Sequence, residues 1–364
     1  MTASLTAITM PKWGLTMTEG KVVRWAHAAG EAVAAGDELL EIETTKVANV
    51  VEAEGDATIL RIVAAEGATL PIGALLAVVG PRDTPAAEVE AFVAGFTVVA
   101  PEAAEGAEAA APAPKMVDAG GRQLQYLEIG EGEPMVLVHG FGGDLNNWMF
   151  VQPTLAEKHR TIALDLPGHG GSAKDVGAGD ADTLAGVVEA ALDALGVKGA
   201  HLAGHSMGGA IAALVAARRP DLVSALTLIA PAGLGAEING AFIAGFVRMQ
   251  RRKEAQETLS FLVHDPALVS RRMIEDVLRY KRLDGVDTAL QTIARAWFDG
   301  DRQRVRVRDQ LASLRIPLRI IWGKDDRIVP PSHAQGFADT HILDAAGHLP
   351  HLEKAGEVLR VMKA

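Results

Sequence analysis

The sequence predicts a multidomain protein in which an all-β flattened barrel precedes an α/β unit that carries a helical insertion. With 364 residues, the chain is longer than one average domain. Short apolar runs separated by Gly-rich turns fill residues 1–80, which is typical of all-β structure. Strand-like and helical patterns alternate over residues 116–364, which indicates a parallel sheet covered by helices. Between them, residues 81–115 differ in composition from both units.

Composition limits the classes of partner and chemistry. The net charge is 35 − 46 = −11 and no basic run occurs, which argues against a nucleic-acid partner. The chain has no cysteine, so disulfides, cysteine nucleophiles and thiolate metal sites are excluded. The N-terminus lacks the pattern of a secretory signal, and no apolar run approaches the roughly 18 residues of a membrane span. We therefore expect no membrane association and a cytoplasmic protein.

The β unit contains an internal repeat. The segments "GEAVAAGDELLEI" (30–42) and "GATLPIGALLAVV" (67–79) both begin with Gly-x5-Gly. Two similar four-stranded halves related by a pseudo-dyad would form a flattened barrel, with Lys46 near the turn that joins them. The strands are expected at residues 22–25, 39–43, 48–53, 58–63 and 75–79.

The segment between the two units combines a short helix with a linker. Apolar residues at helical spacing over 88–96 predict one apolar helix face, which we expect to pack on its own domain. A docking helix for a partner protein is the alternative. Residues 100–115 are rich in Ala, Pro and Glu, a composition typical of an extended, soluble linker.

The α/β unit is predicted from buried-strand runs separated by helical patterns at 183–196 and 207–218. The region of about 233–300 interrupts this alternation with helical, Arg-rich sequence. We interpret it as a helical cap over the site. The strand runs are at residues 135–140, 161–170, 200–206, 225–231 and 318–326.

A serine nucleophile is predicted at Ser206. The sequence Gly204-His205-Ser206-Met207-Gly208 fits Gly-x-Ser-x-Gly between a predicted strand and a predicted helix, the context of a nucleophile elbow. The glycines permit a tight turn that exposes the hydroxyl. The helix that follows directs its N-terminal amides at the site.

The acid and the base should follow the serine along the chain. The segment "WGKDDRIVP" (322–330) ends a strand and resembles the Trp-Gly-x-x-Asp-x-x-x-Pro of many α/β-hydrolases, in which Asp326 rather than Asp325 occupies the acid position. In "AAGHLPHLEK" (345–354), His348 after Gly347 is the expected base, with His351 as the alternative.

An oxyanion hole needs two backbone amides directed at the developing negative charge. We expect the N–H of Met207 and the N–H of Phe141, which lies in the loop "HGFGG" (139–143). We interpret His139 in this loop as structural. These residues together indicate a serine hydrolase or an acyltransferase.

The N-terminal segments "MPKWGLTMTEGKVVRW" and "GDELLEIETTKVANVVEA" resemble the lipoyl domains of 2-oxo acid dehydrogenase complexes over residues 5–80. The resemblance implies a lipoyl/biotinyl-type barrel with lipoyl amide-linked to Lys46. Most lipoyl domains have an aspartate before this lysine, whereas this chain has Thr45. The acetoin branch of the family shows the same departure. Biotinyl domains flank their lysine with methionines, so Thr45 and Val47 favour lipoyl.

A lipoyl domain followed by an α/β-hydrolase resembles the dihydrolipoyllysine-residue acetyltransferase component of the acetoin dehydrogenase complex along the whole chain. The His-x-x-x-Asp-Gly motif of the usual acyltransferases of such complexes is missing. The resemblance implies transfer of acetyl from the Lys46 arm through Ser206 to coenzyme A. The implied partners are a thiamine-diphosphate-dependent acetoin dehydrogenase component and a dihydrolipoyl dehydrogenase.

Other interpretations of these motifs stay open. Ser206 could serve a thioesterase or esterase that uses water and is tethered to a lipoyl carrier, or the hydrolase scaffold could be inert. The arginines of the cap either bind the phosphates of coenzyme A or form a solvated helix face, which is the commoner case. They are Arg248, Arg251, Arg252, Arg271 and Arg272.

Overall fold

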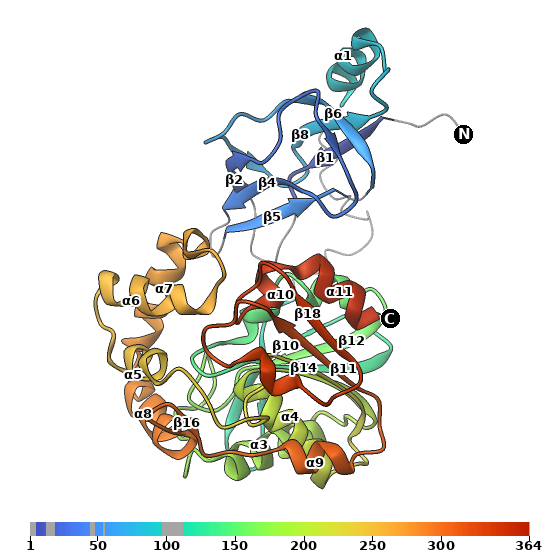
Figure 1. Ribbon diagram of the computed structural model, residues 1–364. Coiled ribbons are helices and arrows are strands. Elements are labelled where there is room, and N and C mark those ends of the chain that lie inside the picture. Colours follow the sequence, from blue (N-terminus) through green and yellow to red (C-terminus); the bar gives the residue numbers. More distant parts are fainter. Residues whose placement is uncertain (1–4, 12–18, 44–47, 54, 97–111, 364) are drawn as a thin grey trace. The chain divides into compact units, whose positions relative to one another are not determined.

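The computed structural model describes residues 5–11, 19–43, 48–53, 55–96 and 112–363 (Figure 1). The chain divides into two units, Met1–Ala111 and Pro112–Ala364. Each unit has its own sheets and its own core.

The first unit contains two four-stranded antiparallel sheets, as the predicted barrel requires. Side chains buried between them include Val22, Leu40, Ile42, Ile59 and Leu76. The very short strands β3 and β7 were not predicted from the sequence. In spatial order, the strands are β1 (Thr6–Thr9), β8 (Leu75–Gly80), β6 (Ala57–Ile62) and β3 (Ala32–Val33) in one sheet, and β5 (Ala48–Glu52), β4 (Glu38–Glu43), β2 (Glu19–Trp25) and β7 (Thr69–Pro71) in the other.

The internal repeat of the sequence is also a repeat of the backbone. Gly30 and its counterpart Gly67 have φ values of 94° and 84°, and Gly36 and its counterpart Gly73 have values of 90° and 78°. Residues other than glycine rarely adopt these left-handed conformations. The same pair of turns is therefore built twice, once in each half.

The helix α1 (Ala86–Gly95) packs on the first unit. Its buried Val89 joins Leu75 and Val78 of β8 in one cluster, and Phe92 and Phe96 cover the edge of that cluster. The apolar face of α1 is thus used within its own unit, as the spacing of its apolar residues favoured. The Ala/Pro/Glu-rich segment that follows lies mostly outside the described residues.

The second unit is built on an eight-stranded sheet. Its strands pair in parallel except β10, which is antiparallel to both of its neighbours, β9 and β12. The prediction of a parallel sheet therefore missed this edge, where a short hairpin suffices because antiparallel strands need no crossover. In spatial order, the strands are β18 (Thr340–Leu343), β17 (Leu318–Gly323), β14 (Val223–Ile229), β13 (Ala200–His205), β11 (Glu133–Val138), β12 (His159–Leu164), β10 (Gln123–Ile129) and β9 (Lys115–Asp118).

Helices cover both faces of this sheet, and Figure 1 shows the sheet between the two groups. One group contains α3 (Ala181–Ala194), α4 (Met207–Arg218) and α9 (Arg308–Ser313), in which α4 contacts both of the others. The other contains α2 (Gln152–Leu155), α10 (Pro350–Glu353) and α11 (Ala355–Lys363). Short 3-10 turns are η1 (Leu145–Trp148) and η4 (Pro331–Ala334).

The helical insertion lies between β14 and β17 and forms a cap of four helices that pack on one another (Figure 1). Two of its helices have side-chain caps: Asn239 caps α5 and Ser270 caps α7 through their side-chain oxygens. The elements are α5 (Gly240–Arg248), α6 (Arg252–Leu259), η2 (Ser260–Leu262), η3 (Pro266–Leu268), α7 (Arg271–Lys281) and α8 (Val286–Trp297), followed by the hairpin of β15 (Phe298–Asp299) and β16 (Arg302–Gln303).

Candidate active site

The predicted site residues of the second unit follow the C-terminal ends of four strands. Phe141 follows β11, Ser206 follows β13, Asp326 follows β17 and His348 follows β18. These strands run parallel in one sheet, so their C-terminal ends lie at the same edge. This is the edge at which open α/β sheets bind their ligands.

Ser206 occupies a strained turn between β13 and α4. Its φ and ψ are 52° and −118°, a conformation that non-glycine residues adopt only where the surrounding fold enforces it. A Cβ atom on Gly204 would overlap the carbonyl oxygen of Gly208, and one on Gly208 would overlap that of Val138. Glycine is thus required on both sides of the serine.

The N-terminus of α4 begins directly after Ser206. The serine is the N-cap residue, but its side chain makes no capping hydrogen bond, so the hydroxyl is not used to hold the helix. The amide of Met207 belongs to the first turn, whose N–H groups have no acceptor within a helix. This end of the helix favours negative charge.

Asp326 and His348 form a buried pair. The Nδ1–H of His348 donates to Oδ2 of Asp326 over 2.7 Å, and the indole Nε1–H of Trp322 donates to the same oxygen over 2.8 Å. The other oxygen accepts the N–H groups of Ile328 and Val329 at 2.7 and 3.0 Å. Four hydrogen bonds therefore fix the carboxylate, and the bond to Nδ1 leaves Nε2 of His348 free to exchange a proton.

The two alternative residues have other surroundings. The carboxylate of Asp325 pairs with Nδ1 of His264 in the cap at 2.9 Å. His351 is fully buried between the rings of Trp148 and His205, with centroids 4.9 and 4.7 Å away. Burial lowers the pKa of His351 to about 3, so its imidazole is neutral at pH 7.

The loop that contains Phe141 lies against the nucleophile, because a Cβ atom on Gly140 would be 3.0 Å from Cβ of Ser206. Two buried histidines hold this loop. Nε2 of His139 accepts the N–H of Leu166, and Nε2 of His169 accepts the N–H of Gly142, both over 3.0 Å. Burial lowers the pKa of His139 to about 4 and that of His169 to about 3, which keeps both rings neutral acceptors.

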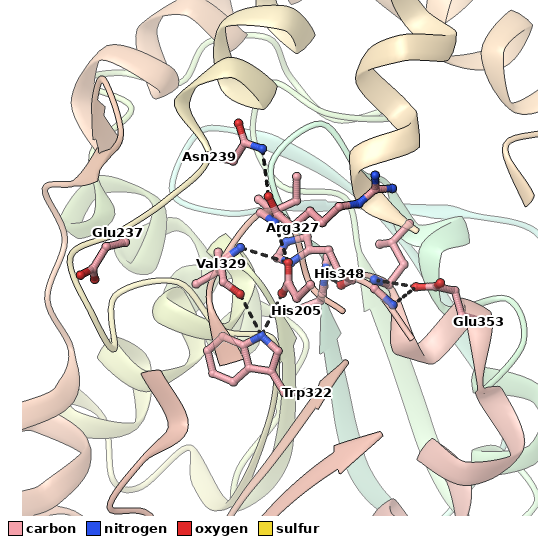
Figure 2. Close-up of polar contacts among 12 residues, drawn as sticks. His205, Glu237, Asn239, Trp322, Arg327, Val329, His348 and Glu353 are labelled. Carbon is pink, nitrogen blue, oxygen red and sulfur yellow. Dashed lines mark hydrogen bonds and ion pairs between the residues drawn. The ribbon is translucent and has the colours of Figure 1, made fainter. Parts of the chain in front are cut away.

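Three residues that support the site were not predicted from the sequence. They are His169, His205 and Glu353. Nε2–H of His205 donates to the carbonyl oxygen of His348 over 2.8 Å, and Glu353 faces the His348 loop (Figure 2). The only signals in the sequence were a histidine beside the nucleophile and a glutamate within the largely apolar "HLPHLEK".

The predicted lipoyl position, Lys46, lies outside the described residues. The strands on either side of it are described: β4 and β5 pair antiparallel, with Glu43 opposite Ala48. Residues 44–47, which include Lys46, join these two strands in the sequence.

Among the described residues, no group of three or more His, Asp or Glu side chains is arranged to hold a metal ion. None of the helices in the described ranges combines the length and the hydropathy that crossing a bilayer requires.

The barrel, the sheet and the strained serine turn define a class, a carrier domain of the biotin/lipoyl type joined to an α/β hydrolase. Comparison with protein families agrees. The family described as "alpha/beta hydrolase fold" matches residues 133–355, and the family described as "Biotin-requiring enzyme" matches residues 6–79. The fold class predicted from the sequence is confirmed.

Two curated proteins are similar along nearly the whole chain. The dihydrolipoyllysine-residue acetyltransferase component of the acetoin cleaving system of Pseudomonas putida is 48% identical, over 98% of this chain and 97% of that protein. The component of the same name from Cupriavidus necator is 39% identical, over 98% of this chain and 96% of that protein. The chain belongs to this family of dihydrolipoyllysine-residue acetyltransferases, which confirms the resemblance seen in the sequence.

The second unit also resembles solved structures. A mutant of a meta-cleavage product hydrolase covers 68% of this chain and 96% of its own, with a TM-score of 0.61 and 23% identity. At this identity the likeness shows the fold alone.

Proposed function

We propose that Ser206, His348 and Asp326 transfer an acetyl group from a thioester to coenzyme A. The observation that carries the proposal is the hydrogen bond from His348 to the buried, fixed carboxylate of Asp326, at the sheet edge that also holds the strained Ser206. This combination supplies a base oriented by an acid, next to a nucleophile that the backbone presents.

The transfer has two halves. In the first, Nε2 of His348 takes the proton of Ser206, and Oγ of Ser206 attacks the thioester carbonyl. The N–H groups of Met207 and Phe141 stabilise the oxyanion. The carbon–sulfur bond then breaks, and the proton on His348 passes to the departing thiolate. Acetyl-Ser206 remains.

In the second half, the thiol of coenzyme A gives its proton to His348 and its sulfur attacks the acetyl carbonyl. The same two amides stabilise the second oxyanion. The bond to Oγ breaks, His348 returns the proton to Ser206, and acetyl-CoA leaves. Asp326 orients the ring and stabilises its charged form throughout.

The acetyl group reaches this site on the first unit. A lipoyl group amide-linked to Lys46 supplies a dithiol that carries acetyl when it is bound. We assign residues 1–80 to the lipoyl domain, residues 81–115 to the helix and linker, and residues 116–364 to the catalytic domain, with its cap at about 233–300. Tethering raises the effective concentration of the arm at the catalytic domain, so weak docking suffices.

Arginines of the cap are candidates for binding the phosphates of coenzyme A. Arg252 and Arg271 both pair with Glu275, at 2.6 and 3.1 Å. Arg272 pairs with Asp276 at 3.6 Å. Among the described residues, Arg248 and Arg251 have no salt bridge. Of these two, Arg248 is the better candidate, because Arg251 interacts electrostatically with the carboxylate of Glu254 in the same cap.

As a member of its family, the chain works with other components of an acetoin-cleaving system. We propose that these are a thiamine-diphosphate-dependent acetoin dehydrogenase component, which delivers acetyl to the arm, and a dihydrolipoyl dehydrogenase, which reoxidises it. We place the complex in the cytoplasm. The net charge of −11 supports partners other than nucleic acid.

A hydrolase is the second candidate. It is favoured by the similarity of the second unit to hydrolases, such as the 2-hydroxy-6-oxo-2,4-heptadienoate hydrolase of Pseudomonas putida at 28% identity. In that case water would resolve acetyl-Ser206.

A single-turnover assay on the full-length lipoylated protein separates the two. The reduced arm on Lys46 is acetylated, and the acetyl group is followed with and without coenzyme A. Acetyl-CoA that forms with wild type and fails to form with Ser206→Ala supports the transferase. Acetate released at one rate whether or not coenzyme A is present would contradict it and indicate a tethered thioesterase.

A further inference from the structure

We propose that Glu353 is a positioning residue that ties the loop of His348 to the helical cap, so that the base is held in place only while cap residues 260–264 are docked on that loop. This inference rests on the proposed role of His348 as the base.

The carboxylate of Glu353 divides its two oxygens between the loop and the cap. Oε1 accepts the N–H groups of Gly347 and Leu349, on either side of His348, at 2.9 and 3.3 Å. Oε2 accepts the N–H of His264 at 2.6 Å. One side chain therefore joins the loop of His348 to His264 of the cap, which lies 89 residues before Glu353 in the sequence.

The cap makes further contacts with the same loop. The N–H of His348 itself donates to the carbonyl oxygen of Leu262 over 2.8 Å. The guanidinium of Arg327, next to Asp326, donates to the carbonyl oxygen of Val263 over 2.8 Å. A Cβ atom on Gly347 would lie 2.7 Å from the amide nitrogen of His264, so the two backbones touch directly.

Burial of the ionised Glu353 carboxylate costs free energy. Glu353 is 8% exposed, and among the described residues no lysine or arginine forms a salt bridge with it. Burial raises its pKa, the usual sign that the ionised form has lost hydration. An ion in such a place is retained where its hydrogen bonds are needed, since a carboxylate can accept from several backbone amides at once.

Capping of the short helix α10 explains only part of the arrangement. The bond from Oε1 to the N–H of Leu349 satisfies a backbone amide at the start of α10. A purely structural role for Glu353 would need this bond alone. The bond from Oε2 to His264 leaves the helix and reaches the cap. This second bond is the one that couples the cap to the base.

The two oxygens make the proposal testable by substitution. In Glu353→Gln, the amide oxygen best occupies the Oε1 position, where it keeps two bonds. The NH2 group then faces the N–H of His264, donor against donor, so the tie to the cap is lost while the loop stays held. Glu353→Ala loses both. Glu357→Gln, one turn further along α11, is the matched control for the same chemical change.

The experiment combines steady-state kinetics with hydrogen exchange on the full-length lipoylated protein, using S-acetyldihydrolipoamide and coenzyme A as substrates. We expect Glu353→Gln to lower kcat about 10-fold and Glu353→Ala to lower it about 100-fold. The KM of each variant should stay within about 2-fold of wild type, because the substitutions displace His348 and leave the substrate-binding sites in place. In exchange, Glu353→Gln should deprotect 260–264 alone, and Glu353→Ala should deprotect 346–349 as well. Glu357→Gln should match wild type.

Glu353→Gln with wild-type kcat and wild-type protection at 260–264 would overturn the proposal. So would loss of kcat in proportion to unfolded protein, measured by circular dichroism, because that outcome indicates a structural role alone. Ser206→Ala and His348→Ala are assayed in parallel. If they keep activity, the proposed function fails, while the exchange pattern still decides whether Glu353 couples the cap to the loop.

Discussion

Nε2 of His205 lies 2.8 Å from the carbonyl oxygen of His348, so the residue before the proposed nucleophile holds the backbone of the proposed base. The two rings are buried, with centroids 4.8 Å apart. Burial holds the pKa of His205 far below its usual value, which keeps the ring neutral, and the carbonyl acceptor places its single proton on Nε2. One hydrogen bond thereby links the loops of Ser206 and His348.

We expect His205→Ala to lower kcat by about 10-fold, because the His348 backbone loses this support and the base shifts from Ser206. His201→Ala is the matched control. His201 lies on the same strand and bonds Thr227 at 2.8 Å, away from the base. Steady-state acetyl transfer to coenzyme A measures both. Equal losses in the two variants would contradict a specific role for His205.

The neighbouring aspartates should differ sharply. Asp326→Asn is expected to reduce kcat by about 10⁴-fold, since an amide at this position favours the wrong tautomer of His348. Asp325→Asn removes only the contact with His264 and should retain activity within about 3-fold. The rate of acetyl-CoA formation distinguishes them, and a larger loss for Asp325→Asn would reverse the assignment of the acid.

Because the turn at Ser206 is strained, replacing this residue with glycine should stabilise the folded protein while it removes the hydroxyl. Ser206→Gly relieves a φ of 52° and should raise the free energy of unfolding by about 1 kcal/mol relative to Ser206→Ala. The alanine variant also lacks the hydroxyl but keeps the Cβ, so the comparison isolates the backbone. Urea unfolding measures the difference. Equal midpoints would show that the turn stores no strain.

His169 should make stability depend on pH. Its pKa is about 3 in the folded protein, against about 6.5 in an unfolded chain. Between these values the unfolded state binds a proton that the folded state does not. The contribution of His169 to the free energy of unfolding is therefore complete above pH 6.5. As the pH decreases below this value, the free energy of unfolding falls by up to about 1.4 kcal/mol per pH unit.

His169→Gln keeps an acceptor for the N–H of Gly142 but cannot titrate, so its unfolding free energy should fall less steeply between pH 6.5 and 4. His341→Gln, at an exposed histidine paired with Asp339, is the control. Urea unfolding at several pH values supplies the slopes. A slope for His169→Gln equal to that of wild type would contradict the prediction.

The sequence was most informative where local rules determine structure. The glycine pairs of the repeat predicted the two halves of the barrel, because left-handed turns need glycine. Gly-x-Ser-x-Gly between a strand and a helix predicted the turn at Ser206. Asp326 and His348 could be proposed from chain order, and the structure brings these two side chains together.

The supports of the site could not be predicted, because they depend on contacts distant in sequence. Glu353 at the end of a short helix has the pattern of a surface residue until the cap is placed against it. The same holds for His169, whose acceptor role depends on a loop 27 residues earlier. The antiparallel edge strands β9 and β10 gave only short, mixed patterns.

The tie between Glu353 and His264 can form only late in the synthesis of the chain. A ribosome delivers Ser206 first, then the cap, and only afterwards Asp326, His348 and Glu353. Until Glu353 has emerged, no carboxylate can bond His264, which lies 89 residues earlier in the chain. A chain that ends before Glu353 therefore contains Ser206 and the cap but lacks the side chain that joins His264 to the loop of His348.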